Sequence, residues 1–511
     1  MPAPAPEPAE PSAERLIEAQ RAVLVALRAV APVTDRLAER FAAAGRELHL
    51  VGGFVRDAVL GRLQPDLDFA TDARPEEIVA LTRGWVDATW DTGIAFGTVG
   101  MRKDEHRLEI TTYRSEAYDR TSRKPRVDYG DSLEDDLSRR DFTVNAMAIT
   151  LPDGTFVDPY GGLRDLLTRV LRTPGRPQDS FSDDPLRMLR AARFAATLPA
   201  RVAPEVRGAM RSMADRLEII TPDRIQGELT KLLLAPQPRP GLELLVDTGL
   251  AVHFLPELPA LRLAADPLHR HKDVYAHTLT VLDQAIGLES GGPDLTLRMA
   301  ALLHDIGKPK TRSFEPGGGV SFHHHEVVGR DMARARLLAL RYAKPFVDAV
   351  TRLVELHLRF HGYGTGEWTD SAVRRYVRDA GPLLDRLHKL VRSDCTTRNP
   401  RKAAALGRAY DALERRIERL AKEEDLAALR PDLDGEDVMT ILGVPPGRLV
   451  GAALKHLLEL RMEHGPLGRE AAIAELRRWA AEQGSGSGRR YILQTGCGMS
   501  STGDEATDRR G

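Results

Sequence analysis

The stretch around Asp66-Leu67-Asp68 constrains the fold most, because it alternates acidic and apolar residues shortly after a glycine pair, Gly52-Gly53. A β-strand places alternate side chains on one face, so Asp66 and Asp68 would point the same way. Two carboxylates held that close repel each other and ionise together only beside a cation. A hard divalent ion such as Mg²⁺, bound through one or two carboxylates and the phosphates of a substrate, meets this requirement.

The glycine pair predicts where such phosphates would lie. Gly52-Gly53 supplies a bend at which backbone N–H groups can approach an anion, and Arg56 follows closely enough to neutralise its charge. The alternative is an acidic turn on a solvated surface. We favour a metal site facing a triphosphate, because the glycines, Arg56 and apolar flanks occur together.

A third carboxylate stands in the segment RLEITTYR. Glu109, Thr111 and Tyr113 share a face by alternation if this segment is a strand. Glu109 is therefore a further candidate catalytic residue that completes a cluster with the two aspartates. An exposed glutamate beside Arg107 explains the same pattern equally well on local grounds.

Length and composition set the architecture. A chain of 511 residues is too long for one core, and 42% hydrophobic with 29% charged residues describes a globular protein without a membrane span. Two cysteines favour a reducing, cytoplasmic location. Because the net charge is only −1, contact with nucleic acid would have to come from local arginine clusters.

The pattern along the chain predicts an α+β fold, in which a small mixed β-sheet is followed by a mostly α-helical neck, body and tail. In residue numbers we expect a disordered leader at 1–13, N-terminal helices at 14–47 interrupted at Pro32, the sheet domain or head at 48–165, the neck at 166–255, a histidine-rich body at 266–400, a helical tail at 401–483 and a disordered tail at 484–511.

The segment LSRRDFTVNAMAI at 137–149 places cationic, anionic and amide groups within two helical turns. Helical spacing would bring Asp141 and Asn145 onto one face, where they could hold a ribose hydroxyl, while Arg140 could reach a phosphate. If the Arg-Arg-Asp run is considered alone, we slightly favour a different interpretation, in which it forms a surface salt bridge that caps a buried helix.

The segment DDPLRMLRAARF predicts a ridge of charged residues on one helix. Its members recur every third residue and are Asp184, Arg187, Arg190 and Arg193. Arginines on a partly apolar helix are costly to bury unless a ligand or carboxylate pairs with them. The alternative is an arginine-rich solvated face.

Taken in order, VGGFVRD, DLDFAT, LEITTYR, RRDFTVNAMA, DDPLRMLRAARF and ITPDRIQGEL resemble the class II tRNA nucleotidyltransferase and poly(A) polymerase family over about residues 48–235. Asp183 departs from the glutamate that is usual in the family. The resemblance implies that residues 48–165 are a nucleotidyltransferase head and 166–255 a nucleotide-selecting neck.

The resemblance also implies roles for individual residues. Gly53 and Arg56 would contact the triphosphate, Asp66 and Asp68 would bind Mg²⁺, and Arg140 would belong to the nucleotide and ribose site. The neck helix that selects the base would carry Asp184, Arg187, Arg190 and Arg193, supported by Arg224 and Glu228. A carboxylate and a guanidinium complement the amino donor and ring-nitrogen acceptor that cytosine and adenine share, which favours CTP and ATP.

A second constellation of histidines and carboxylates lies further along the chain, in VYAHTL, ALLHDIGKP, FHHHEVVG and VRSDCTT. It resembles the HD phosphohydrolase superfamily over roughly residues 270–400. The resemblance implies that His277, His304, Asp305 and Asp394 bind a second divalent metal, with His325 as an additional candidate. A degenerate HD fold that serves as an RNA-binding body is the alternative.

The favoured function is addition or repair of the 3′-terminal CCA of tRNA from CTP and ATP, with release of pyrophosphate. Two alternatives stay open: poly(A) addition to RNA 3′ ends, and hydrolysis of phosphate esters by the HD region as the main activity. The arginine-bearing helices after residue 395 could hold the acceptor arm of a tRNA, or could be ordinary solvated faces.

Overall fold

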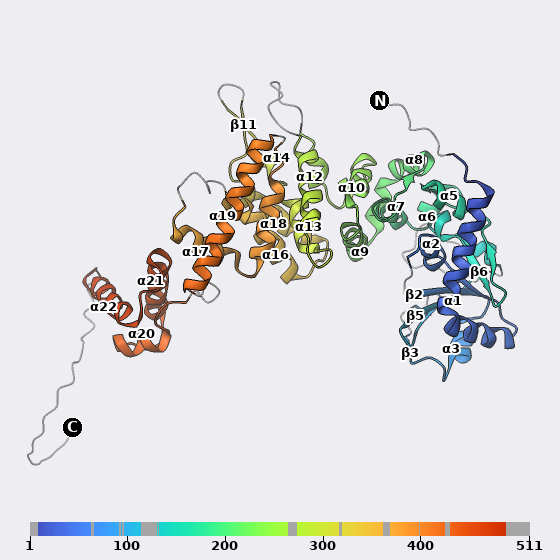
Figure 1. Ribbon diagram of the computed structural model, residues 1–511, viewed down its shortest axis with the longest axis horizontal. Coiled ribbons are helices and arrows are strands. Elements are labelled where there is room, and N and C mark those ends of the chain that lie inside the picture. The colour runs from blue at the N-terminus through green and yellow to red at the C-terminus, as the bar shows by residue number, and fades with distance from the viewer. Residues whose placement is uncertain are drawn as a thin grey trace, which may run out of the picture. The chain divides into compact units, whose positions relative to one another are not determined.

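The computed structural model describes residues 9–62, 66–90, 93–94, 97–113, 130, 132–263, 273–315, 319–360, 368–397, 399–424 and 430–486. The chain divides into two compact units, Met1–Glu355 and Leu356–Gly511, each treated by itself below (Figure 1). Most of the expected leader and nearly all of the expected disordered tail lie outside the described residues. Within the described part of the chain, no helix is both long and apolar enough to cross a membrane.

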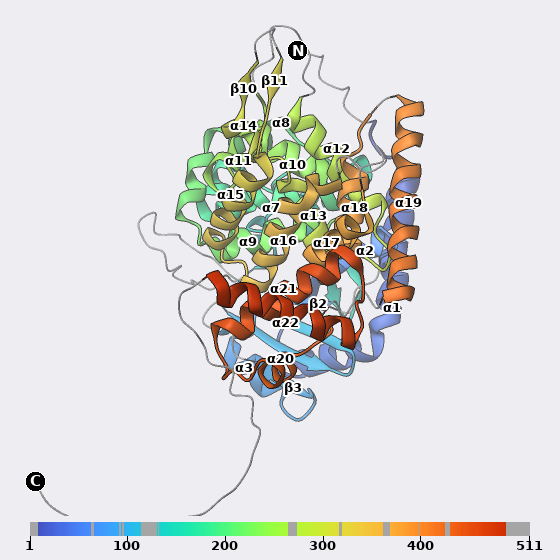
Figure 2. The same cartoon turned by 90° about the vertical axis from the view of Figure 1, so that its left-hand side faces the viewer.

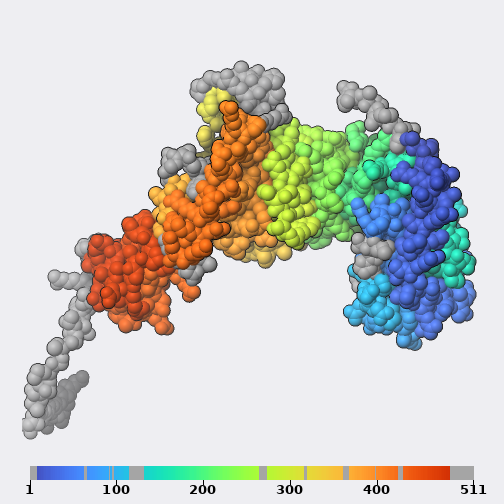
Figure 3. Space-filling model, viewed as in Figure 1, coloured from blue at the N-terminus to red at the C-terminus, as the bar shows by residue number. Residues whose placement is uncertain are grey.

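The first unit begins with one long helix, α1 (Ala13–Ala43), which starts at the N-cap Ser12. The predicted interruption at Pro32 is wrong, because α1 runs through this proline. Pro32 and Arg28 both lie on the exposed face, so the Arg28 carbonyl that loses its helical donor can bond to water. The buried face packs on the sheet and its helices, and Figure 3 shows α1 in dark blue along the outer surface of the head.

Among the described residues, seven strands form one mixed sheet in the head, in the order β3-β4-β5-β2-β1-β6-β7. Strands β2 and β5 pair in parallel, and the other neighbours are antiparallel. The expected α+β class is confirmed. The strands are β1 (Leu48–Val51), β2 (Asp66–Thr71), β3 (Ala88–Trp90), β4 (Thr98–Lys103), β5 (His106–Thr112), β6 (Ala148–Leu151) and β7 (Thr155–Val157).

Short helices connect these strands: α2 (Gly53–Val59), α3 (Pro75–Thr82), α4 (Leu133–Ser138), the 3₁₀ turn η2 (Thr143–Asn145) and α5 (Gly162–Thr168). The helical spacing considered for Asp141 and Asn145 does not occur. Helix α4 ends at Ser138, Phe142 is extended, and a single 3₁₀ turn leads into β6. Burial on both sides of this turn, at Phe142 and Val144, explains why the segment does not form a one-sided amphipathic helix.

The neck consists of helices packed around α7 (Leu186–Thr197). Its other elements are β8 (Val170–Leu171), α6 (Pro177–Asp183), β9 (Arg201–Val202), α8 (Pro204–Ser212), η3 (Ala214–Ile219), α9 (Pro222–Leu233), α10 (Pro238–Asp247), η4 (Leu250–His253) and α11 (Glu257–Ala260). Helices α9 and α10 both pack on α7. Gly241 permits the close approach of α10, since a Cβ there would lie 2.4 Å from the Ala192 carbonyl oxygen.

The body helices of the first unit are α12 (Val274–Gly287), α13 (Leu295–Leu303), α14 (Lys308–Thr311), α15 (His325–Ala339) and α16 (Lys344–Leu356), with the hairpin β10 (Ser313–Phe314) and β11 (Val320–Ser321). Figures 1 and 2 show them grouped next to the neck helices α9 and α10. The buried Arg298 ties body to neck by donating to the carbonyls of Leu233 and Ala235 at 2.6 and 2.8 Å. Its charge is balanced by Glu289 at 2.6 Å.

The second unit is helical: η5 (His357–Phe360), α17 (Asp370–Ala380), η6 (Gly381–Leu383), α18 (Leu384–Asp394), α19 (Pro400–Glu424), α20 (Gly435–Leu442), α21 (Arg448–His464) and α22 (Arg469–Gly486). Helices α20, α21 and α22 enclose a small core that includes Val438, Leu457 and Leu476. The buried Arg374 of α17 donates to the Met462 carbonyl near the end of α21 at 3.1 Å. A cation at the carboxyl end of a helix also interacts favourably with its dipole.

Two glycines of the neck test the packing of α7. We expect Gly241→Ala to lower the free energy of unfolding by about 1–3 kcal/mol, because the added methyl meets backbone that cannot move cheaply. Gly227→Ala on α9 is the matched control: its Cβ would enter open space, and alanine should stabilise that helix by up to about 1 kcal/mol. Urea unfolding measures both, and equal stability of the two variants would contradict the packing described here.

Candidate nucleotide site in the head

The predicted alternation of β2 is confirmed by burial. Leu67 and Phe69 are fully buried, whereas Asp66 is exposed and Asp68 half-buried on the opposite face. Asp68 is directly opposite Glu109 in the parallel pairing of β2 with β5. Register partners on adjacent strands project to the same side of a sheet, so the three carboxylates gather on one face.

The electrostatics of Asp68 reflect this crowding. Its burial, followed by the negative charges of Glu109 and Asp66, raises the pKa of the Asp68 carboxyl, and the nearby Arg140 only partly opposes this. A carboxylate cluster of this kind supplies the hard oxygen ligands that divalent cations prefer. The residues present therefore fit a metal ion bound at Asp66 and Asp68.

The glycine turn lies directly beside these carboxylates. Gly52 has a φ of 68°, and a Cβ on it would be 2.9 Å from Arg140 Nη1 and 4.0 Å from Asp68 Oδ2. Only glycine combines this conformation with so close an approach. The next residue, Gly53, begins α2. The Gly52 turn thus lies beside both Arg140 and Asp68, whereas the sequence placed Arg56 next to the glycine pair.

The arginines near this turn are held by acidic neighbours that sequence reasoning missed. Arg56 donates to Asp57 at 2.9 and 2.8 Å and to Asn145 Oδ1 at 2.6 Å. Arg140 pairs with Asp136 at 3.1 Å. The i,i+4 spacing of Asp136 and Arg140 on and after α4 was a signal that could have revealed this pair.

Asp141 and Asn145 do meet, although through the 3₁₀ turn rather than a helix. Asp141 Oδ1 accepts from Asn145 Nδ2 at 2.8 Å and from the backbone N–H of Phe142 at 2.9 Å. Asp141 Oδ2 accepts from Arg190 Nε at 2.7 Å. Both oxygens of Asp141 therefore accept hydrogen bonds within the protein.

The predicted ridge of four charged residues on one helix is partly wrong. Asp184 precedes α7 as the C-cap of α6, where its carboxylate accepts from the Leu186 N–H at 3.1 Å and from Arg224 at 2.8 Å. The three arginines do lie on α7. Arg187 donates to Ser180 Oγ at 2.8 Å and to the Arg139 carbonyl at 2.6 Å.

The other two arginines of α7 are half-buried and form ion pairs rather than a solvated face. Arg190 contacts Asp141, as described above, and Arg193 donates to the buried Glu228 at 2.7 Å. Glu228 and Arg224 of α9 therefore contact the residues that they were expected to support.

The histidines of the body converge on Asp305, which is almost fully buried. His277, His304 and His325 place their Nε2 atoms 3.4, 3.2 and 3.3 Å from its carboxylate oxygens. Lys308 Nζ lies 2.6 Å away.

The ring orientation of two of these histidines suits metal binding. His304 Nδ1 and His325 Nδ1 each lie 2.8 Å from a backbone carbonyl, that of Ala301 and of Phe322 respectively. A carbonyl accepts from Nδ1–H, so Nε2 presents its lone pair, as in metal-ligating histidines. The set fits a divalent metal. Asp394, the remaining predicted ligand, ends α18 in the second unit.

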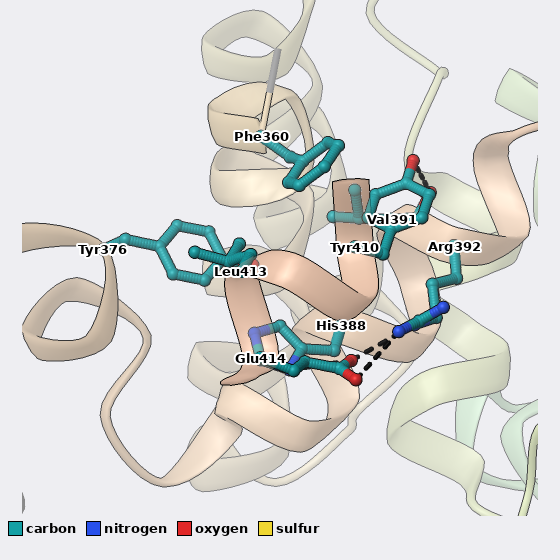
Figure 4. A pocket seen from close by; sticks show the side chains of 8 residues that line it. All are labelled: Phe360, Tyr376, His388, Val391, Arg392, Tyr410, Leu413 and Glu414. Carbon is teal, nitrogen blue, oxygen red and sulfur yellow. Dashed lines mark hydrogen bonds and ion pairs between the residues drawn. The ribbon is translucent and has the colours of Figure 1, made fainter. Parts of the chain in front are cut away.

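A small pocket in the second unit does not compete with the head as a nucleotide site. Figure 4 shows His388 stacked on Tyr376, at a ring distance of 5.7 Å, with Glu414 between His388 and Arg392. The cavity has a volume of about 10 Å³, which is room for about one water molecule.

Comparison with known families agrees with the order of these regions. Residues 48–172 match the poly A polymerase head domain, 201–261 the probable RNA and SrmB-binding site of polymerase A, and 274–396 the HD domain.

Individual relatives align over much of the chain. The A-adding tRNA nucleotidyltransferase of Deinococcus radiodurans is 36% identical over 445 residues, covering 85% of this chain and 95% of that protein. The CC-adding tRNA nucleotidyltransferase of Thermus thermophilus is 34% identical, covering 84% and 93%. The CCA-adding enzyme of Streptococcus gordonii is 43% identical over 231 residues, which is 45% of this chain and 56% of that protein.

A solved structure shares the fold. The Bacillus stearothermophilus CCA-adding enzyme in complex with CTP superposes with a TM-score of 0.64 at 26% identity, covering 88% of this chain and 98% of that one.

If the histidine cluster binds a divalent metal, that binding should require Asp305. We expect Asp305→Asn to bind about one equivalent less Mn²⁺ than the parent in equilibrium dialysis, because the histidines lose their shared anionic partner. Asp283→Asn, on the same helix as His277 and paired with Arg239, is the matched control and should bind as the parent does. Equal Mn²⁺ binding by Asp305→Asn and the parent would remove Asp305 from the metal site.

Proposed function

Because the chain belongs to the family of tRNA nucleotidyltransferases and poly(A) polymerases, we propose that it adds or repairs the 3′-terminal CCA of tRNA from CTP and ATP. The family relationship expected from the motif order is confirmed by relatives that align over 93–95% of their own length. The observation that carries the proposal is the carboxylate cluster of β2 and β5 beside the Gly52 turn. With two cysteines in 511 residues, a reducing cytoplasm is the compartment we propose.

The names of the relatives support tRNA as the substrate and leave the choice of bases to experiment. Two relatives that align over most of their length are named for adding A and for adding CC, and shorter matches are named for adding CCA. The similar solved structure contains CTP. We favour CCA addition over poly(A) addition and over hydrolysis because these relatives are named for adding nucleotides to tRNA.

In the proposed reaction, the 3′-hydroxyl of the tRNA attacks the α-phosphate of the nucleotide, and pyrophosphate leaves. Asp66 and Asp68 would hold Mg²⁺, which would supply positive charge at the reacting phosphate. Gly53 and the preceding turn let backbone N–H groups approach the triphosphate, while Arg56 and Arg140 neutralise its charge. Glu109 would add negative charge beside the cation, as it does beside the Asp68 carboxylate.

We propose that Asp184 and Arg187 read the base. A carboxylate accepts from the amino group of cytosine or adenine, and a guanidinium donates to the adjacent ring nitrogen. Arg187 has five N–H donors, more than its contacts with Ser180 and Arg139 use. Guanine and uracil would leave polar groups unpaired or opposed, which a site of this kind rejects strongly.

One assay separates the candidate activities. Purified protein is given a tRNA that lacks its last three nucleotides, with CTP and ATP offered separately and together. We expect two C residues with CTP alone, and C, C and A followed by a stop with both. Long A tails on unstructured RNA would support poly(A) addition, and phosphate release without extension would support hydrolysis. Addition limited to CC, or to A on a tRNA that already ends in CC, would narrow the proposal to that step.

The carboxylates of β2 should be required for this activity. We expect Asp68→Asn to lower the rate of CMP incorporation at least about a hundredfold, because the cation loses an anionic ligand. Asp72→Asn is the matched control, since Asp72 follows the same strand but faces Arg46 at 3.3 Å. Circular dichroism checks that both variants fold. Near-normal incorporation by Asp68→Asn would remove it from the catalytic site.

A further inference from the structure

Arg107 lies on the same face of the head sheet as the carboxylate cluster. It precedes Glu109 by two residues on β5 and is the register partner of Asp66 on β2. Residues two apart on a strand share a face, so these side chains project together. The charge of Arg107 also reaches Asp68: burial is the largest cause that raises the pKa of the Asp68 carboxyl, and Arg107 is among the cations that oppose it.

Two neighbours orient the Arg107 guanidinium. Its Nη2 donates to Glu109 Oε1 at 2.8 Å, and its Cζ lies 5.4 Å from the centroid of the Trp90 ring. Trp90 on β3 is paired with Gly100 on β4, and its indole occupies the space above that glycine, because a Cβ on Gly100 would overlap the indole. A guanidinium that is already oriented by an indole and a carboxylate loses less freedom when it binds a ligand.

Arg107 is on the opposite side of β2 from the proposed triphosphate site. The two neighbours of β2 in the sheet are β1 and β5. The Gly52 turn follows β1 and lies beside Arg140, whereas Arg107 belongs to β5. In phosphoryl transfer the attacking and leaving oxygens lie roughly in line across the phosphorus. Pyrophosphate that leaves toward β1 therefore requires the RNA 3′-hydroxyl to enter from the side of β5.

An RNA end that enters from this side meets negative charge. Asp66 is exposed and the side chain of Glu109 is 41% exposed, so both repel a phosphodiester. Arg107, with 56% of its side chain exposed, supplies positive charge at the same place. A guanidinium has five N–H donors and can pair with two phosphate oxygens at once, and the contact with Glu109 uses Nη2.

We propose that Arg107, oriented by Trp90 and Glu109, binds the phosphate on the 5′ side of the last nucleotide of the RNA acceptor and so places its 3′-hydroxyl for attack. Two residues of a strand cover about 6.6 Å, which sets Arg107 about one nucleotide's length from Glu109. This inference rests on the proposed function, and it adds the residue that receives the RNA on the side away from the triphosphate.

The first test separates binding of RNA from binding of nucleotide. Steady-state addition of CMP to a tRNA that lacks CCA gives kcat/KM for tRNA at saturating CTP, and KM for CTP at saturating tRNA. We expect Arg107→Gln to lower kcat/KM for tRNA about tenfold or more, because a charge-assisted contact is lost. KM for CTP should stay within about twofold of the parent, since the triphosphate contacts are untouched.

Salt dependence gives a second readout that a merely structural role would not change. Each phosphate contact in a single strand contributes about 0.7 to the slope of log(kcat/KM) against log salt, because counterions are released. Arg107→Gln should make the slope for tRNA shallower by about 0.7. Arg107→Lys keeps the charge without the two-nitrogen geometry, so it should lose about threefold in kcat/KM and keep the parental slope.

An acceptor with one uncharged linkage identifies the phosphate. With a methylphosphonate in place of the last phosphodiester, the parent should lose about as much kcat/KM as Arg107→Gln loses with ordinary tRNA. Arg107→Gln with this modified acceptor should be no worse than either change alone, since both remove one contact. A methylphosphonate several linkages upstream is the matched control, and it should affect parent and variant equally.

Arg36 of α1 provides the matched control variant. Its side chain is 63% exposed and lies 3.0 Å from Glu39, so it repeats the exposed ion pair of Arg107 on the outer face of a helix. Arg36→Gln should keep the parental kcat/KM and the parental salt slope. Circular dichroism and urea unfolding check that each variant folds.

The outcomes distinguish the inference from the proposed function. In an active parent, the inference is overturned by a parental kcat/KM for tRNA in folded Arg107→Gln, by an equal loss in Arg36→Gln, by a change in KM for CTP alone, or by additive losses with the methylphosphonate. If Arg107→Gln does not fold, Arg107→Lys decides, and a parental kcat/KM there overturns the inference. A parent protein that extends no tRNA contradicts the proposed function itself, and the inference with it.

Discussion

The head is organised around the repulsion of carboxylates gathered on one face of β2 and β5. Leu67 and Phe69 must be buried beneath the sheet, which directs Asp66 and Asp68 to the other face. The parallel register then places Glu109 beside Asp68. The glycine turn that follows β1 lies beside Asp68. In the proposed function, a bound cation would relieve the repulsion between the carboxylates. Fold and proposed chemistry thus depend on the same alternation.

In the neck, the partly buried charges are arginines rather than carboxylates. Its arginines would be expensive to bury alone, yet each has a specific partner, such as Asp141 for Arg190 and Glu228 for Arg193. Because one of these partners belongs to the head, the proposed base-reading helix and the proposed triphosphate site are joined by ion pairs.

The sequence predicted what depends on local pattern. The alternation of β2 and the glycine turn were found because their signals lie within a few residues. Asp184 was misplaced on α7, although it precedes Pro185, and residues before proline avoid the helical conformation. Strand β3 has only three residues, too few for an alternation of side chains to be recognised in the sequence. The contact of Asp141 with Arg190 joins positions 49 residues apart, and no local pattern encodes such a pair.

The central claim is that the paired aspartates of β2 bind the cation that meets the triphosphate. A crystal structure of the protein with CTP and Mn²⁺, using the anomalous signal of manganese, tests this most directly. The account predicts an anomalous peak within coordinating distance of both Asp66 and Asp68, with the phosphates of CTP beside the Gly52 turn. Manganese and triphosphate bound elsewhere, with no peak at these carboxylates, would contradict it.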